Sequence, residues 1–373
     1  MQATLDTFRD AILRAGDNRT PLRLRGGGSK DFYGQALDGE VLDTRPYAGI
    51  VDYDPAELVI TARCGTPLAE IEATLAERRQ ILAFDPPHFA GADGVSRATF
   101  GGMVAAGLSG PRRQSAGALR DFVLGVRVMD GRGEVMSFGG QVMKNVAGYD
   151  VSRLMAGSLG TLGLILEASL KVMPAPFEDA TLRFHLAQGE AILRINQWGG
   201  QPLPIAASVW HDGALHVRLS GASAAVRAAR ERLGGQAVDE AEAQALWRGL
   251  REQSHVFFAP ALQGRALWRI AVPPTTAPLA LPPGDELIEW GGGQRWWMPH
   301  APATHGPAAA QEAAAVRETA LAAGGHATLF RNGDKSAGVF TPLAAPLMAI
   351  HTRLKAAYDP AGIFNPRRLY PGL

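Results

Sequence analysis

A run of glycines between cationic side chains is the first segment of this sequence that can do chemistry. Arg25-Gly26-Gly27-Gly28-Ser29-Lys30 comes directly after Leu22–Arg25, an alternating stretch typical of a β-strand. Consecutive glycines let neighbouring backbone N–H groups point into one concavity, which suits a phosphate or diphosphate, and Arg25, Ser29 and Lys30 can add donors. The order of residues matches neither the GxGxxG fingerprint nor a Walker A loop. A flexible glycine turn without a ligand explains the same residues.

Two more segments are rich in glycine and lie next to apolar runs. Residues 96–112 are small and apolar, so their backbone can approach a flat ring and donate hydrogen bonds to its edge. Residues 157–163 read GSLGTLG and precede an expected strand over 164–172. Taken alone, the first segment also fits a tightly packed helix crossing, and the second also fits an ordinary loop. Three glycine-rich loops next to strands are a more specific sign of a ligand site together than any one of them alone.

The elements that must position these loops are short strands and helices in alternation. The hydrophobic spacing predicts helices, with the strands between them, in both halves of the chain. The expected helices are 4–15, 67–78, 188–198, 221–233, 239–253, 306–324 and 343–357; the expected strands are 22–25, 41–44, 58–62, 122–129, 134–138, 164–172, 181–186, 205–211 and 214–219. The proline-rich stretch 273–284 is expected to be a loop, and the tail 358–366 to be irregular.

Charge and cysteine content exclude several classes of protein. Lys plus Arg is 37 and Asp plus Glu is 36, whereas a dedicated nucleic-acid binder carries a basic excess. Cys64 is the one cysteine, so the chain can form no internal disulfide and cannot hold an iron–sulfur cluster by itself. The N-terminus has no basic and then apolar signal, and no apolar stretch is long enough for a membrane span. We expect a cytoplasmic protein.

The glycine segments together resemble the FAD-binding domain of the vanillyl-alcohol oxidase / p-cresol methylhydroxylase (PCMH-type) superfamily. The matching segments are RGGGSKDFYG (25–34), ATFGGMVAAGLSGP (98–111), RDFVLGVRVMDGRGEV (120–135), GSLGTLGLILEASLKVMP (157–174) and DPAGIFNP (359–366). Within the superfamily, KNVAGYDVSRLMAGSLGTLG (144–163) is most similar to the FAD-binding E subunits of bacterial glycolate oxidases. The similarity is strong over about residues 20–175 and 350–373.

This resemblance implies an α+β fold in which two α+β subdomains hold FAD between them. It implies a PCMH-type FAD-binding domain over 1–175, an α+β cap domain over 176–345, and a C-terminal segment, 346–373, that returns to the FAD site. By the same resemblance Arg25, Gly26, Gly27, Gly28, Ser29 and Lys30 hold the diphosphate. Thr99, Gly101, Gly102, Ser109 and Gly110 line the flavin and ribityl region, Gly160, Gly163 and Ile165 contact the adenosine side or the ring, and Asn365 lies near the flavin edge.

Two departures from related proteins shape the expectations for cofactor and metal. Members with covalently bound flavin often carry a histidine in the first loop at the position of Ser29, so we expect FAD to be held non-covalently. Related 2-hydroxyacid dehydrogenases carry a histidine-rich metal motif in the cap. The nearest candidates here, His300 and His305, lie in a segment interrupted by prolines. A surface loop is the better interpretation, and we expect no metal site.

A flavin enzyme of this kind must also hold a carboxylate and take a proton from a hydroxyl group. Arginine suits the first task and histidine the second. The candidates are Arg295, Arg331 and His326, with Trp296 and Trp297 as walls. Structural roles would account for these residues equally well. Arg295 can form a salt bridge, His326 can be a hydrogen-bonded loop residue, and the two tryptophans can belong to the core. We also expect an apolar surface around Trp290, Trp296 and Trp297 that is buried only in a complex.

Several functions remain compatible with the sequence. The first is the FAD-binding subunit of a heteromeric complex that oxidises glycolate or another small 2-hydroxyacid, with a sister flavoprotein and an iron–sulfur subunit. The second is a non-catalytic subunit that keeps FAD as a relay or scaffold. The third is a stand-alone FAD oxidoreductase on another alcohol or hydroxyacid, and the last is a phosphate binder without flavin.

Overall fold

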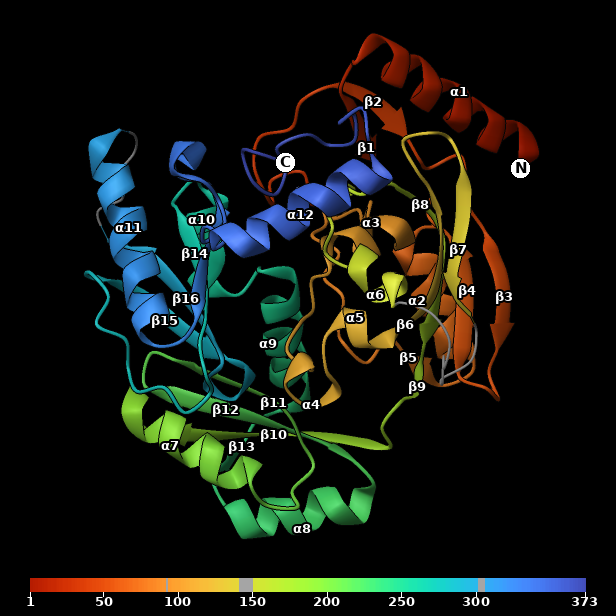
Figure 1. The fold of residues 1–373 in the computed structure, drawn as a ribbon. Helices are drawn as coiled ribbons and strands as arrows, with labels where there is room; N and C mark the ends of the chain where they lie inside the picture. Colours follow the sequence, from red (N-terminus) through yellow and green to blue (C-terminus); the bar gives the residue numbers. More distant parts are fainter. Residues whose placement is uncertain (92, 141–149, 301–305) are drawn as a thin grey trace. The chain divides into compact units, whose positions relative to one another are not determined.

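The computed structural model describes residues 1–91, 93–140, 150–300 and 306–373. The chain forms two compact units (Figure 1). Unit 1 consists of Met1–Leu108, Ala118–Pro174 and Pro342–Leu373, and unit 2 consists of Ser109–Gly117 and Ala175–Thr341. Both units mix helices with sheets, which confirms the α+β fold. No helix in the described ranges is both long and apolar enough to cross a membrane.

Unit 1 is built on a five-stranded sheet of order β3-β4-β8-β6-β7, in which every neighbouring pair is antiparallel. A separate parallel pair, β1 with β2, carries the glycine loop at its end. The strands are β1 (Leu22–Arg25), β2 (Glu40–Asp43), β3 (Ile50–Asp54), β4 (Val59–Arg63), β5 (Gln80–Ile81), β6 (Val123–Met129), β7 (Val135–Gly139), β8 (Leu164–Lys171) and β9 (Met173–Pro174). The helices are α1 (Gln2–Asn18), α2 (Leu68–Glu77), α3 (Phe100–Ala106), α5 (Leu119–Phe122), α6 (Val151–Met155) and α12 (Ala345–Tyr358).

The two ends of the chain share one hydrophobic core in unit 1. Phe8 and Ile12 of α1 are buried with Leu22 of β1 and with Phe364 of the C-terminal tail. The tail runs parallel to β1, because the Leu22 N–H donates to the Ile363 carbonyl at 2.7 Å and the Leu22 carbonyl accepts from the Asn365 N–H at 2.9 Å. The tail therefore lies beside the strand that carries the glycine loop at its end.

Unit 2 contains one eight-stranded sheet of order β13-β10-β12-β11-β15-β16-β14-β17, with antiparallel pairs throughout. Its strands are β10 (Glu178–His185), β11 (Ile205–His211), β12 (Ala214–Gly221), β13 (Gln236–Ala237), β14 (Leu267–Ala271), β15 (Gly284–Glu289), β16 (Gln294–Pro299) and β17 (His326–Arg331). Its helices are α4 (Arg113–Ala116), α7 (Gln188–Gly199), α8 (Ser223–Leu233), α9 (Glu240–Glu252), α10 (Ala259–Leu262) and α11 (Pro307–Ala322), with short 3₁₀ turns at Val256–Phe258, Trp290–Gly292 and Lys335–Ala337.

The tryptophan pair of β16 corrects one expectation. Trp296 is 5% exposed and Trp297 is fully buried within unit 2. Trp297 contributes to a core cluster that includes Trp268 of β14 and Val316 of α11. The prediction that these side chains are buried only in a complex is therefore wrong for both, because Trp297 packs in this cluster and Trp296 packs against Phe258 and Phe330 of the same unit.

Candidate dinucleotide-binding site

The loop after β1 has glycine at three positions where a larger residue would be strained or would collide. A Cβ at Gly26 would overlap the side chain of Thr99, and one at Gly27 would overlap the carbonyl of Arg97. Gly28 has a φ of +74°, a conformation that L-residues rarely adopt. The glycines let the loop lie directly against the 97–99 segment. This packing accounts for them without a ligand, so the case for a binding site depends on what surrounds the loop.

The glycine loop lines one of two adjoining cavities in unit 1, with empty volumes of about 550 and 380 Å³. The cavities share walls formed by Leu24, Arg25, Gly26, Gly102, Ala105, Leu159 and Asn365. The first adds Gly27, Gly28, Ser29, Lys30, Asp31, Leu37, Thr99, Ala106 and Arg368, and the second adds Thr44, Cys64, Gly101, Gly160, Gly163, Leu164 and Ile165. One end of this crevice is thus rich in cations and the other in small and apolar residues.

Helix α3 supplies the wall between the glycine loop and the sheet. Thr99 caps the helix, since its hydroxyl accepts from the Gly102 N–H at 3.3 Å. Gly101 lies so close to Cys64 that a Cβ would overlap the cysteine side chain. Small residues here let the helix approach β4 closely and leave the second cavity open. The alternative interpretation was a tightly packed helix crossing; the close packing described here is between the helix and the end of β4, and it also forms the cavity wall.

Asn365 joins the three segments that meet at the crevice. Its Oδ1 accepts from the Leu24 N–H at 2.9 Å, and its Nδ2 donates to the Leu159 carbonyl at 2.7 Å. A Cβ at Gly160 would come within 2.8 Å of Asn365 Nδ2, which explains the glycine there. Sequence reasoning placed Asn365 at the site, and the contacts add that it fixes the 157–163 loop to the end of β1.

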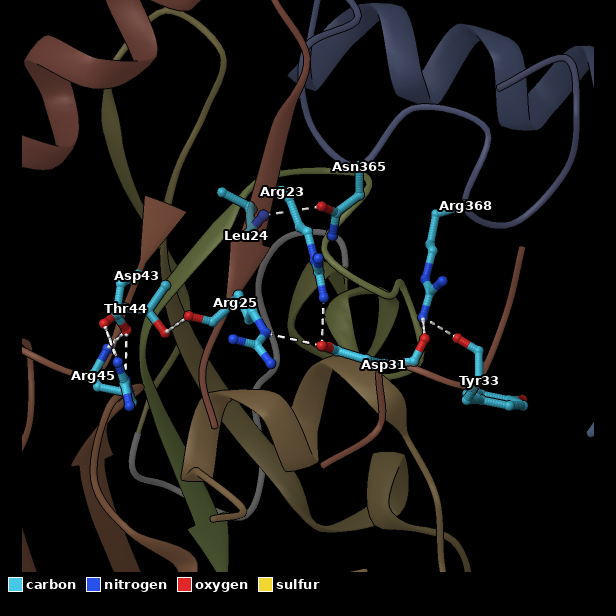
Figure 2. A network of polar contacts seen from close by, with 10 residues as sticks. All are labelled: Arg23, Leu24, Arg25, Asp31, Tyr33, Asp43, Thr44, Arg45, Asn365 and Arg368. Atoms are coloured by element: carbon cyan, nitrogen blue, oxygen red, sulfur yellow. Dashed lines mark hydrogen bonds and ion pairs between the residues drawn. The ribbon is translucent and has the colours of Figure 1, made fainter. Parts of the chain in front are cut away.

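A network of ion pairs surrounds the start of the crevice (Figure 2). Oδ2 of Asp31 accepts from Nε of Arg25 at 2.9 Å and also from the guanidinium of Arg23. The backbone of Arg25 is fixed as well, because its carbonyl accepts from the Thr44 N–H at 2.9 Å. Both the main chain and the side chain of Arg25 are therefore held in place beside the glycine loop.

Arg368 anchors the segment that follows the glycine loop. Its guanidinium is buried and donates to the carbonyls of Asp31, at 2.9 Å, and of Tyr33 and Gln35. Burial lowers the pKa of Arg368 to about 10, so the side chain keeps its charge at neutral pH. The tail thus contributes a positive charge to the cavity and holds Asp31 in place.

Two side chains of the site, Asp31 and Arg368, were not predicted from the sequence, and Cys64 was noted only for its redox chemistry. Burial raises the pKa of the Cys64 thiol to about 12. Cys64 is therefore a small apolar wall of the second cavity and a poor nucleophile. The signal for Asp31 lay in the quoted RGGGSKDFYG segment, and the signal for Arg368 in a cation just beyond the matched tail.

Ser109 and Gly110, the other predicted flavin contacts, belong to unit 2. There the Gly110 carbonyl accepts from Nε1 of Trp290 at 3.1 Å. All other predicted cofactor contacts line the two cavities of unit 1. Lys144, Asn145 and Tyr149, which mark the subfamily in the sequence, lie outside the described residues.

The three predicted catalytic residues have unlike surroundings in unit 2. Arg295 is fully buried and donates to the carbonyls of Gly292 and Thr276, each at 2.7 Å, while burial lowers its pKa to about 10. Arg331 donates to Oε1 of Gln253 at 2.9 Å, and burial lowers its pKa to about 10. His326 begins β17 and is exposed. Arg295 has the environment of a core residue.

The histidines considered for a metal are also in unit 2. His300 lies 2.9 Å from Asp285 through Nε2, and His305 lies outside the described residues. Within the described ranges, no three His, Cys, Asp or Glu side chains are grouped so as to hold a metal ion.

The crevice fits FAD on the chemistry of its walls. The first cavity has Arg25, Lys30 and Arg368 against one carboxylate, Asp31, which suits a diphosphate. The second has glycines and aliphatic side chains, which suit a flat ring lying against backbone. Glycine at positions where a Cβ would overlap a neighbour lets the segments that form the walls pack closely against one another.

Comparison with known proteins agrees with this chemistry. Residues 3–139 match a family described as an FAD binding domain. Glycolate oxidase subunit GlcE of Escherichia coli (strain K12) is 47% identical over 372 residues, which is 100% of this chain and 98% of that protein. Glycolate oxidase subunit GlcD of Bacillus subtilis (strain 168) is 30% identical over 44% of this chain and 34% of its own length.

Solved structures support the fold. An alkyldihydroxyacetonephosphate synthase structure aligns with a TM-score of 0.65 at 15% identity, covering 97% of this chain and 75% of that one. At that identity the match concerns the fold alone. The full-length similarity to GlcE is close enough to assign a family, and this chain belongs to the family of the FAD-binding glycolate oxidase subunit GlcE, with FAD as its cofactor.

Proposed function

We propose that the chain is the FAD-binding subunit of a heteromeric complex that oxidises glycolate to glyoxylate, with electrons passing through FAD to partner subunits. The observation that carries this proposal is the 47% identity, over the whole chain, to a protein named as a glycolate oxidase subunit. The cationic and apolar halves of the crevice in unit 1 support the flavin part of the proposal independently.

The partners we propose are a sister flavoprotein and an iron–sulfur subunit. A relative named as a different glycolate oxidase subunit, GlcD, is similar over part of the chain, which supports a second flavoprotein of related build. The one cysteine of this chain leaves it without ligands for a cluster, so electrons that leave the flavin need an acceptor on another chain. We propose a cytoplasmic complex that meets the inner membrane through its other subunits.

When bound, FAD supplies the acceptor for two electrons from the substrate. The residues of this chain would hold it: the backbone of the 26–30 loop and the side chains of Arg25 and Lys30 would contact the diphosphate, and the residues around Gly101 and Gly163 would border the rings. We propose non-covalent binding, because the first loop has Ser29 where covalent members have histidine and because the Cys64 thiol is too weakly acidic to react.

Arg331 and His326 remain proposed contacts for the hydroxyacid. The surroundings of Arg295 support the second candidate function, an FAD relay or scaffold subunit whose sister chain binds the substrate. The Arg295 guanidinium is fully buried, and its Nε and Nη2 already donate to two backbone carbonyls of the same unit.

An anaerobic titration separates the two functions. The purified chain is expected to show oxidised flavin absorbance near 370 and 450 nm, which is a property of the cofactor. Bleaching of the longer band by glycolate in the chain alone would assign catalysis to this subunit. Bleaching only after the sister flavoprotein is added would assign a relay role. A chain that contains no flavin and takes up none would contradict both.

A further inference from the structure

We propose that Asp31 is a positioning residue for the diphosphate of FAD, because it fixes the guanidinium of Arg25 with its terminal nitrogens left for the ligand. This inference rests on the proposed flavin site. It adds a role for Asp31, which belongs neither to the glycines of the loop nor to the cations of the cavity wall. It requires that Asp31 be held in place itself, that it hold Arg25, and that the held Arg25 face the cavity.

Asp31 is fixed through its main chain. Arg368 donates to the Asp31 carbonyl at 2.9 Å and to the carbonyl of Tyr33 (Figure 2). It also donates to the carbonyl of Gln35, so one buried guanidinium fixes the segment after the glycine loop. The Asp31 side chain is about two-thirds buried, with 31% of its area exposed. Because its backbone is fixed at the cavity wall, the Asp31 carboxylate can hold the side chains that donate to it in one orientation.

Asp31 then holds Arg25 through one nitrogen only. Nε of Arg25 donates to Oδ2 at 2.9 Å, while the same oxygen accepts from Arg23. Neither terminal nitrogen of Arg25 donates a hydrogen bond to an acceptor in the described part of the chain. The guanidinium also lies against the glycine loop, because a Cβ at Gly28 would overlap it. One terminal nitrogen of Arg25, Nη2, therefore lies next to Gly28 of the loop, and Arg25 lines both cavities.

Preorganisation gives this arrangement its value. An arginine side chain loses conformational entropy when it is ordered, and Asp31 orders Arg25 before the ligand arrives. Removal of the carboxylate has a second, opposite effect, since it takes one negative charge away from an anion site. Screening weakens that effect at physiological ionic strength, where the Debye length is about 8 Å. We therefore expect the loss of positioning to dominate.

The test is a flavin titration of the full-length apo chain at about 0.15 M salt, where screening is strong. Loss of one charge-assisted contact is expected to weaken FAD binding about tenfold in Arg25→Gln. Asp31→Asn is expected to weaken it by a similar factor, and Arg25→Gln/Asp31→Asn to be no weaker than Arg25→Gln alone. Asp38→Asn is the matched control, because Asp38 forms an exposed ion pair with Arg367 at 2.6 Å, and it is expected to change nothing.

The salt dependence distinguishes positioning from a structural role. Asp31→Asn and Arg25→Gln are both expected to flatten the dependence of FAD affinity on salt, because both lose the same contact between charges. Tighter binding by Asp31→Asn, or a double variant about tenfold weaker than Arg25→Gln, would overturn the inference. If Asp31→Asn does not fold, Asp31→Glu serves, with weaker binding expected only when Arg25 is present. A wild-type chain that binds no FAD would remove the proposed function as well.

Discussion

The side-chain amide of Asn365 donates to the carbonyl of Leu159 at 2.7 Å, across more than two hundred residues of sequence. Because its Oδ1 also accepts from the Leu24 N–H, one side chain connects the C-terminal tail, the end of β1 and the 157–163 loop. Asn365 has a φ of 38°, which asparagine tolerates better than most residues. A single asparagine thus connects three of the segments that form the walls of the two cavities in unit 1.

Asn365→Ala is expected to destabilise unit 1 by about 2 kcal/mol, since it removes two part-buried hydrogen bonds and keeps the unfavourable φ. FAD affinity is expected to fall with it. The chain carries its own reporters: Cys64 lies in unit 1, and all seven tryptophans lie in unit 2. The urea midpoint for Cys64 exposure is expected to drop while the midpoint for tryptophan fluorescence stays.

Asn332→Ala is the matched control. Asn332 also has a positive φ, of 53°, and donates to the carbonyls of Ala261 and Arg265 within unit 2. It is expected to lower the tryptophan midpoint and to leave FAD affinity unchanged. If both variants lowered both midpoints equally, the units would unfold together, and the assignment of Asn365 to unit 1 stability would fail.

Gly27→Ala is expected to abolish FAD retention. The added Cβ would overlap the carbonyl of Arg97, which is backbone and cannot turn aside, so the loop must leave the 97–99 segment. Flavin absorbance per protein after gel filtration measures the effect. Gly199→Ala is the control, because no atom lies within 4 Å of its added Cβ and the residue ends helix α7. A Gly27→Ala chain that keeps its flavin would mean that the loop does not hold the cofactor.

The comparison of sequence with structure shows what local patterns can and cannot predict. The glycine loops were predictable, because glycine is needed where backbone approaches backbone or φ is positive, and such positions cluster next to strands. Helices α1, α9 and α11 were predictable from spacing. Strands β14 to β17 were not assigned from the sequence. For β15 the reason is that it begins at Gly284, at the edge of a proline-rich stretch that reads as a loop.

The side chains that organise the site were harder to predict for a different reason. Arg368 and Asp31 act through backbone carbonyls and through each other, and partners more than three hundred residues apart leave no local signature. Arg295 illustrates the opposite difficulty. A cation between glycines and tryptophans looks functional in sequence, but the structure buries it fully, and two carbonyls of its own unit accept from its Nε and Nη2.

Cys64 is expected to be unreactive until unit 1 unfolds. With a pKa of about 12, only about one thiol in ten thousand is ionised at pH 8, and the side chain is buried as well. A thiol reagent at pH 8 is expected to label the native chain far more slowly than the urea-unfolded chain, and bound FAD is expected to slow labelling further because Cys64 lines the second cavity. Rapid labelling of the native chain would show that this wall opens readily.

Glu289 predicts a pH dependence of unit 2. Burial raises the pKa of this carboxyl to about 7, although Trp296 and Gln294 donate to it at 2.6 and 3.1 Å. Its unfolded pKa is 4.5, so the folded state favours the protonated form. The associated stability is fully present below pH 4.5 and is lost as the pH rises through about 7. Ionised and buried at pH 8, Glu289 is expected to cost unit 2 about 3 kcal/mol relative to its protonated form.

Glu289→Gln is expected to stabilise unit 2 at pH 8 and to have no such effect at pH 4.5, because the amide resembles the protonated acid at every pH. The urea midpoint of tryptophan fluorescence measures this difference. His216 and His255, whose pKa values burial lowers to about 4, act in the opposite sense, since their contribution is lost as the pH falls from 6.5 toward 4. Both histidines are present in both proteins, so their contribution cancels between variant and wild type. A stabilisation that did not grow between pH 4.5 and 8 would show that the pKa of Glu289 is not raised in the folded state.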